Sequence, residues 1–86
     1  MSEFYRLSWI QAQNNLATTQ DIYALIDGVH TELAINVEIV DSEIDYIFPT
    51  DSVIEWWVRT NIRDELKNIH SFDSNHYTFI STNQGI

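Results

Sequence analysis

The sequence of 86 residues contains no cysteine, one proline and two glycines. Without cysteine there is no disulfide framework and no thiolate metal site, so the chain must fold through burial of its side chains. No apolar run approaches the roughly 20 residues that a membrane-spanning helix needs, and the first residues lack the pattern of a signal peptide. We therefore expect a cytoplasmic protein, located in the host cytoplasm if a phage encodes it.

Lysine and arginine are also absent from Leu7 to Val58, and this absence is the most informative one. Because the acidic and basic residues outside this block cancel, the whole net charge of −9 belongs to the block. A field of one sign repels nucleic acid and anionic membranes and attracts cationic surfaces. The expected partner is thus a protein with a basic surface, such as a nuclease or another nucleic-acid-binding protein. The carboxylates of the block are Asp21, Asp27, Glu32, Glu38, Asp41, Glu43, Asp45, Asp51 and Glu55.

Hydrophobic residues make up 44% of the chain, which is enough for the core of a single domain over residues 1–86. Two segments have apolar residues at helical spacing, over about residues 19–33 and 51–69. The first carries Ile22, Ile26 and Val29 on one face behind a threonine cap. The second begins at PTDSVIE, where Ser52 and Glu55 have the spacing of a capping box. We predict a helix in each.

Four other segments alternate between apolar and polar residues, as strands with one buried face do. They cover about residues 4–10, 35–40, 43–48 and 76–81, and a loose tail over 82–86 follows. With a turn at Asp41 and Ser42, the two middle segments form a hairpin in which Ile39 lies opposite Ile44. The resulting βαββαβ order predicts an α+β, ferredoxin-like domain, with a four-stranded antiparallel sheet and two helices on one face. This architecture alone implies no activity.

Two groups of residues have the composition of a metal site without its spacing. Asp41, Glu43 and Asp45 resemble the start of a calcium loop, but Tyr46 stands where that loop needs glycine. His70, Asp73 and His76 could bind zinc or iron, yet no fourth ligand accompanies them. We interpret the first group as a solvated sheet face and the second as a polar loop. No metal and no cofactor is predicted.

Catalytic signatures are missing as well. The chain has no glycine-rich phosphate loop, and no serine stands in a nucleophile elbow. We therefore predict that it is not an enzyme, with a small enzyme subunit using buried carboxylates or His70 and His76 as an alternative.

Trp56 is the remaining residue of interest. On a helix over 51–69 it would point into the face of Arg59, Arg63 and Lys67. It would then either lie over the arginine stems or form an exposed contact residue for a partner. The same face could also mediate self-association.

These patterns favour a small acidic inhibitor that binds a protein and blocks its nucleic-acid-binding surface. Phage anti-restriction and anti-CRISPR proteins, and bacterial immunity proteins, form this physical class of nucleic-acid mimics. The alternative is a homo-oligomeric regulatory or ligand-binding domain without catalysis, for instance a homodimer. The predicted partner-binding residues are Glu38, Asp41, Glu43, Asp45, Asp51, Glu55 and Trp56.

Overall fold

The computed structural model describes residues 2–11 and 17–81, and these residues form an all-β protein of seven strands in two sheets. The described residues contain no helix, and therefore no helix that is long and apolar enough to cross a membrane. The predicted tail over 82–86 lies outside the described residues. The strands are β1 (Ser2–Ser8), β2 (Ala17–Ile26), β3 (Val29–Glu38), β4 (Glu43–Pro49), β5 (Val53–Arg63), β6 (Ile69–Asp73) and β7 (Tyr77–Ile80).

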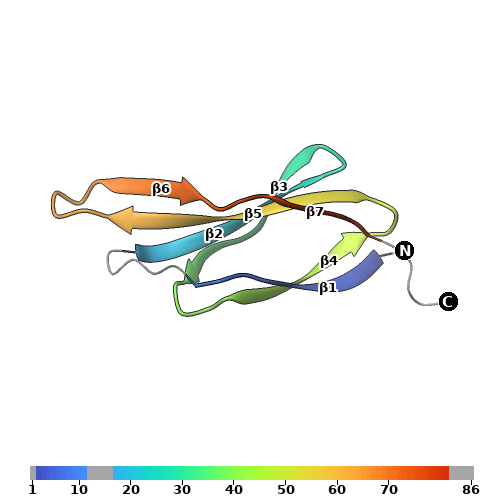
Figure 1. Cartoon of the computed structure of the whole chain (residues 1–86), viewed down its shortest axis with the longest axis horizontal. Coiled ribbons are helices and arrows are strands. Elements are labelled where there is room, and N and C mark those ends of the chain that lie inside the picture. Colours follow the sequence, from blue (N-terminus) through green and yellow to red (C-terminus); the bar gives the residue numbers. More distant parts are fainter. Residues whose placement is uncertain (1, 12–16, 82–86) are drawn as a thin grey trace.

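The two sheets differ in size and lie over one another as the layers of a sandwich (Figure 1). The small sheet pairs β1 with β4, and the large sheet has the order β3-β2-β5-β6. Strand β7 also pairs with β5, beside Val53–Trp56, whereas β6 lies beside Arg59–Arg63. Strands β6 and β7 therefore follow one another along the same edge of β5. All five pairings are antiparallel.

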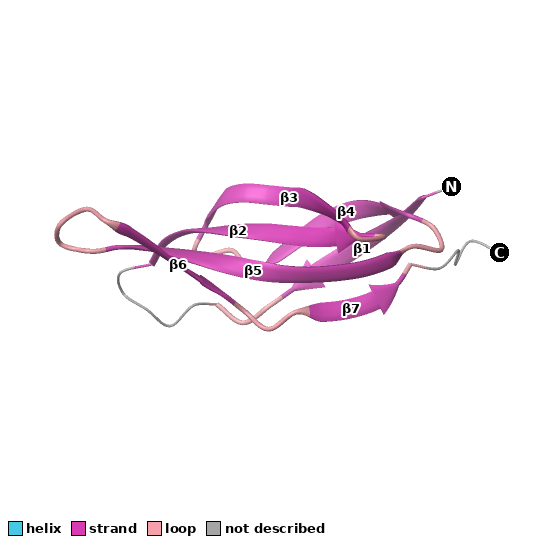
Figure 2. Ribbon diagram, turned by 90° about the horizontal axis from the view of Figure 1, so that it is seen from above, coloured by secondary structure: helices cyan, strands magenta, loops and turns pink. Residues whose placement is uncertain are grey.

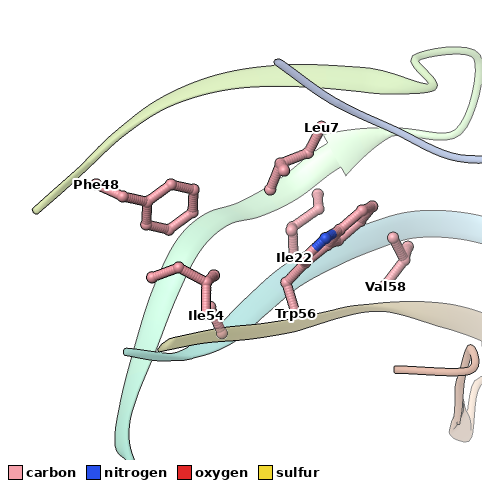
Figure 3. Packing of buried hydrophobic residues seen from close by; sticks show 7 residues of the cluster. Leu7, Ile22, Phe48, Ile54, Trp56 and Val58 are labelled. Carbon is pink, nitrogen blue, oxygen red and sulfur yellow. The ribbon is translucent and has the colours of Figure 1, made fainter. Parts of the chain in front are cut away.

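The core lies between the two sheets (Figure 3). Leu7 and Phe48 of the small sheet face Ile22, Ile54 and Trp56 of the large sheet, and Phe48 and Ile54 are completely buried. Every second residue of β5 points inward here, which is the period of a strand with one buried face. Trp56 is consequently a core residue and only 6% exposed. Both sequence-based interpretations of Trp56 placed it on an open helix face, and both are wrong.

The α+β prediction is wrong because both expected helices are strands. Residues 19–33 span β2, a turn and part of β3, and residues 51–69 span β5, a turn and the start of β6. Apolar residues lie on both faces of β2, with Ile22 and Ala24 inward and Tyr23 and Leu25 outward. Strands covered on both faces lose the simple alternation, and the remaining apolar residues happened to match a helical spacing. The segment VIEWWVRTNIR in β5 is rich in β-branched and aromatic residues, and this composition favoured a strand over a helix.

A second feature of the sequence that argued against a helix was Asp27–Gly28, the two-residue turn between β2 and β3. Both residues have positive φ, 49° and 84°, as the favoured hairpin turn requires. Asp27 also accepts a hydrogen bond from the backbone amide of Val53 at 2.8 Å, which ties the turn to β5. An Asp-Gly pair between two apolar segments therefore marked a hairpin rather than the interior of a helix.

The expected strand over 43–48 is present as β4, with Ile44, Tyr46 and Phe48 on its inner side, but its partner differs from the prediction. Strand β4 pairs with β1, so that Arg6 lies opposite Asp45, while β3 pairs with β2. The turn predicted at Asp41 and Ser42 lies instead at Ile39 and Val40, and the chain passes there from one sheet to the other without closing a hairpin. Inward and outward alternation defines the faces of a strand but does not determine its neighbour.

Candidate protein-binding surface

The acidic stretch becomes a corner where the chain passes from β3 to β4. Glu38 ends β3, Asp41 lies in the turn and Glu43 begins β4; we call these three residues the acidic corner. All three side chains are exposed. None of them forms an ion pair with a lysine or arginine of the described residues, although the Glu43 charge acts on Arg6 nearby. The corner therefore presents uncompensated negative charge.

A buried glutamine holds this corner in shape. Gln20 of β2 is 1% exposed, and its Nε2 donates to the carbonyl oxygens of Glu38, at 2.7 Å, and Asp41, at 2.5 Å. Its Oε1 accepts a hydrogen bond from Trp9 Nε1 at 3.0 Å. The backbone amide of Trp9 in turn donates to the carbonyl of Ser42. Side-chain bonds from the core thus replace the ladder that the turn lacks, and they hold the backbone from which the side chains of Glu38 and Asp41 project.

Two of the four basic residues are already paired on the sandwich. Arg6 forms an ion pair with Asp45 at 2.9 Å, and Arg59 forms one with Asp73 at 2.7 Å. These contacts raise the pKa of both guanidinium groups, and the Arg59 hydrogen bond lowers the pKa of Asp73. Arg63 and Lys67 pair with no carboxylate of the described residues. Free positive charge is therefore confined to the end of β5 and the turn that follows it.

The structure brings together only part of the predicted partner-binding set. Asp45 follows Glu43 along the same outer face of β4, but Arg6 neutralises it. Asp51 lies in the turn between β4 and β5, at the opposite end of β4 from Asp41. Glu55 lies on the outer face of the large sheet, where its carboxylate contacts His76 Nδ1 at 2.8 Å. With Trp56 in the core, the acidic corner remains at one end of the sandwich, where Glu38 faces outward from the large sheet and Glu43 faces outward from the small sheet.

The outer face of the large sheet holds an aromatic cluster that sequence reasoning missed. His76 stacks on Trp57 with ring centroids 4.3 Å apart, and His30 and Tyr23 contact the same indole. Together they reduce the exposure of Trp57 to 6%, and burial is the main reason that the pKa of Tyr23 is raised. The indole Nε1 of Trp57 is buried and has no hydrogen-bond partner. Only the assignment of residues 53–63 to a strand would have placed these rings together.

Arg59, Arg63 and Lys67, which were predicted to share one helix face, do not form a common basic surface, because Arg59 contacts the aromatic cluster. The Arg59 guanidinium lies 5.0 Å from the centre of the Tyr23 ring and also binds Asp73. Its aromatic partner is thus Tyr23, whereas one of the two interpretations of the predicted helix placed Trp56 over the arginines. Arg63 and Lys67 lie farther along the chain and are exposed. Arg59 belongs to the wall of the sandwich and not to a free basic surface.

The histidines and the aspartate of the suggested metal group each have a separate partner. His70 Nε2 contacts Asp64 Oδ2 at 3.0 Å, His76 contacts Glu55, and Asp73 binds Arg59. Within residues 2–11 and 17–81, no three histidine, aspartate or glutamate side chains are grouped closely enough to bind a metal ion. Each of these polar side chains is thus used in a separate pairwise contact.

A groove of about 390 Å³ lies beside the acidic corner, where the small sheet ends and the inner face of the large sheet is open. Trp9, Ile10, Phe72 and Tyr77 contribute aromatic and aliphatic side chains to its lining. Gln20, which holds the corner, forms part of its lining, as do Val58, Thr60, Asp73, Ser74 and Asn75. The lining of the groove is thus partly apolar and partly polar.

Comparisons of the chain with protein families, with curated proteins and with solved structures found no match.

Proposed function

We propose that the protein is a non-catalytic binding protein whose acidic corner contacts a basic surface of another protein. The observation that supports this proposal is the position of Gln20, whose buried amide holds the backbone of Glu38 and Asp41. A backbone that is already held in place loses little conformational entropy when a cationic partner binds the side chains that it carries. Their long-range field also accelerates the encounter with such a partner.

The acidic corner fits the class of inhibitors that cover a nucleic-acid-binding surface. Such surfaces are built from lysine and arginine that neutralise phosphates, and closely spaced carboxylates can occupy the same side chains. The sandwich itself offers no competing positive charge, because Arg6 and Arg59 are both paired. A protein of this kind acts by occupying its partner, without a chemical step of its own.

The proposal is tested with a short fluorescent oligolysine peptide, whose binding is followed by anisotropy at increasing salt. The test variant combines Glu38→Gln, Asp41→Asn and Glu43→Gln. The matched control combines Glu32→Gln, Asp51→Asn and Glu65→Gln, three exposed carboxylates away from the corner. Both raise the net charge by three. We expect the corner variant to bind about tenfold more weakly and the control to change by less than about threefold.

Equal losses in the two variants would show that net charge alone attracts the peptide, and the proposal would fail. A second measurement addresses inhibition. Wild-type protein should displace a labelled DNA duplex from histones at low salt, and the corner variant should require a much higher concentration. If the corner variant and the control variant displaced the duplex at the same concentration, this result would contradict a role of the corner in blocking such surfaces.

A further inference from the structure

The small sheet consists of β1 and β4 alone, so β4 has one edge that pairs with no other strand of the described residues (Figure 1). Along an antiparallel pair, residues whose backbones bind the partner strand alternate with residues whose backbones point away from it. The amide of Trp9 donates to the carbonyl of Ser42 at 2.9 Å, and this bond fixes the phase of the alternation. Glu43, the next residue, therefore directs its backbone N–H and C=O toward the free edge, as do Asp45 and Ile47.

The same three residues carry their side chains on the outer face of the small sheet. Glu43, Asp45 and Ile47 are all exposed. Ile47 lies opposite Phe4 of β1, and these two side chains are 59% and 63% exposed. Glu43 belongs to the acidic corner, whereas Asp45 binds Arg6 from the side of β1. The free edge of β4 thus presents two carboxylates and one apolar side chain beside a row of backbone donors and acceptors.

We propose that an extended cationic segment of the partner protein adds to this edge as a third, antiparallel strand of the small sheet. The proposal rests on the proposed function, because Glu43 of the acidic corner provides part of the contact. Residues of the added strand that hydrogen-bond to Glu43, Asp45 and Ile47 lie directly opposite them, with Cα atoms about 5.5 Å apart and side chains on the same face. The segment that fits therefore has an apolar residue, a cationic residue two positions later, and a second cationic residue two positions after that.

Charge and regularity distinguish the β4 edge from the other strand edges of the described residues. By the same alternation, the free edge of β1 presents Arg6, and like charges on neighbouring strands repel one another. The free edge of β3 is irregular, because its pairing with β2 shifts register and Asn36 has a φ of 54°. Strands β6 and β7 have only five and four residues. Strand β4 is paired over seven residues without a register shift, and it offers the longest regular acidic edge.

The carboxylates of β4 also disfavour a second copy of the chain at this edge. Two β4 strands paired through their free edges would place the Glu43 and Asp45 carboxylates of both copies along one seam, and like charges on facing strands are destabilising. Charged residues on an edge strand protect it against such self-pairing. A cationic strand turns the same charges into an attraction, so charge complementarity selects this occupant. Backbone hydrogen bonds then supply affinity, and the alternate side chains supply specificity.

The first test uses a short fluorescent peptide and the full-length chain, with binding followed by anisotropy. Isoleucine and two lysines occupy alternate positions of the peptide in this order, and threonines stand between and beside them. In one form the backbone nitrogens of the isoleucine and both lysines are methylated, and in the matched form those of three threonines are methylated. The two forms have the same charge and mass. The first should bind about tenfold more weakly than the unmodified peptide, and the second should change by less than about threefold, because only the first loses the amides that face β4.

Hydrogen exchange of the wild-type chain provides a second measurement that needs no substitution. The amides of Glu43, Asp45 and Ile47 should exchange rapidly in the free protein and about tenfold or more slowly when the peptide is bound. The amides of Ile44 and Tyr46 alternate with them and face β1, so they should exchange slowly in both states.

The position of the added strand is tested by an exchange of charge. Glu43→Lys should weaken binding of the peptide by about tenfold, and a peptide whose second lysine is replaced by glutamate should restore it. Replacement of the first lysine, which faces Asp45, should not restore binding. The matched control is Asp51→Lys, since Asp51 is exposed and lies beyond the other end of β4. This variant should bind the original peptide within about threefold of the wild type.

Equal losses in the two methylated peptides would overturn the proposal, as would unchanged exchange at Glu43, Asp45 and Ile47. Equal restoration of Glu43→Lys by both glutamate peptides would overturn the proposed position of the strand. The oligolysine measurement keeps the two proposals separate. If oligolysine binding depends on the acidic corner while the position of the methyl groups has no effect, strand addition is refuted and the proposed function stands. Oligolysine binding that does not depend on the corner refutes the proposed function, whichever result the methylated peptides give.

Discussion

The sandwich and the projecting part of the β5–β6 hairpin, residues 60–72, place the same kind of residue in opposite surroundings (Figures 1 and 2). We call residues 60–72 the arm. Phe48 of β4 is completely buried between the two sheets, while Phe72 of β6 is 59% exposed on the arm. Charge differs in the same way, because Arg6 and Arg59 of the sandwich are paired with carboxylates, whereas Arg63 and Lys67 of the arm pair with no carboxylate of the described residues. One region uses its apolar and charged groups to fold, and the other leaves them available for contact. The candidate surface lies where these two regions meet.

The largest expected effect tests this difference directly. Phe48→Ala should lower the free energy of unfolding by about 3–5 kcal/mol, which is most of the stability of a small domain. Phe72→Ala should change it by about 1 kcal/mol or less, because more than half of the side chain is already exposed to solvent. Urea titration followed by tryptophan fluorescence measures both. Similar losses in the two variants would mean that the arm is part of the packed core.

An intermediate effect is expected at the junction of the two regions. Gln20→Ala should destabilise the protein by about 2–3 kcal/mol, because it leaves the Trp9 indole N–H and two carbonyls without their partner. Thr18→Ala on the same strand removes one exposed hydrogen bond, to the carbonyl of Asn61 at 3.2 Å, and serves as the control. It should cost less than about 1 kcal/mol.

Hydrogen exchange distinguishes a local effect of Gln20 from general destabilisation. The Asp41 amide, which donates to the carbonyl of Glu38 at 3.0 Å, should exchange faster in Gln20→Ala than the shift in global stability explains. Exchange that follows the global stability alone would show that Gln20 does not hold the corner.

The smallest effect concerns pH. Hydrogen bonds from Arg59 hold the pKa of Asp73 below its ordinary value of 3.8. The native state therefore binds this proton less readily than the unfolded state, and the stabilisation is present above the ordinary pKa and lost as the pH falls below it. Both side chains are more than a third exposed, so the effect is small. Asp73→Asn should flatten the decline of the melting temperature in acid.

The matched variant for this measurement is Asp51→Asn, an exposed carboxylate without an ion pair among the described residues. Its acid profile should remain close to that of the wild type. A steeper decline in Asp73→Asn, or an equal change in both variants, would contradict the role of the Arg59–Asp73 pair.

Alternation of apolar and polar residues predicted the inner side of a strand correctly where the other side of that strand is exposed to solvent. The alternation of residues 43–48 correctly placed Ile44, Tyr46 and Phe48 on the inner side of β4. It failed for β2 and β5, because the Trp57 cluster covers their outer face and removes the alternation. Of the candidate site, the exposure of Glu38, Asp41 and Glu43 followed from the pattern. The link through Gln20 did not, since it joins residues 18 and 21 positions apart.

The amino-acid sequence by itself determined the charge of the protein and the position of that charge along the chain. It also determined the inner and outer sides of β4, because alternation is a local property of the backbone. Only the tertiary structure decided which strands are neighbours, which carboxylates are neutralised and that Trp56 is buried. Those outcomes depend on contacts between residues far apart in sequence, and a local pattern contains no information about which distant segment will cover a given face.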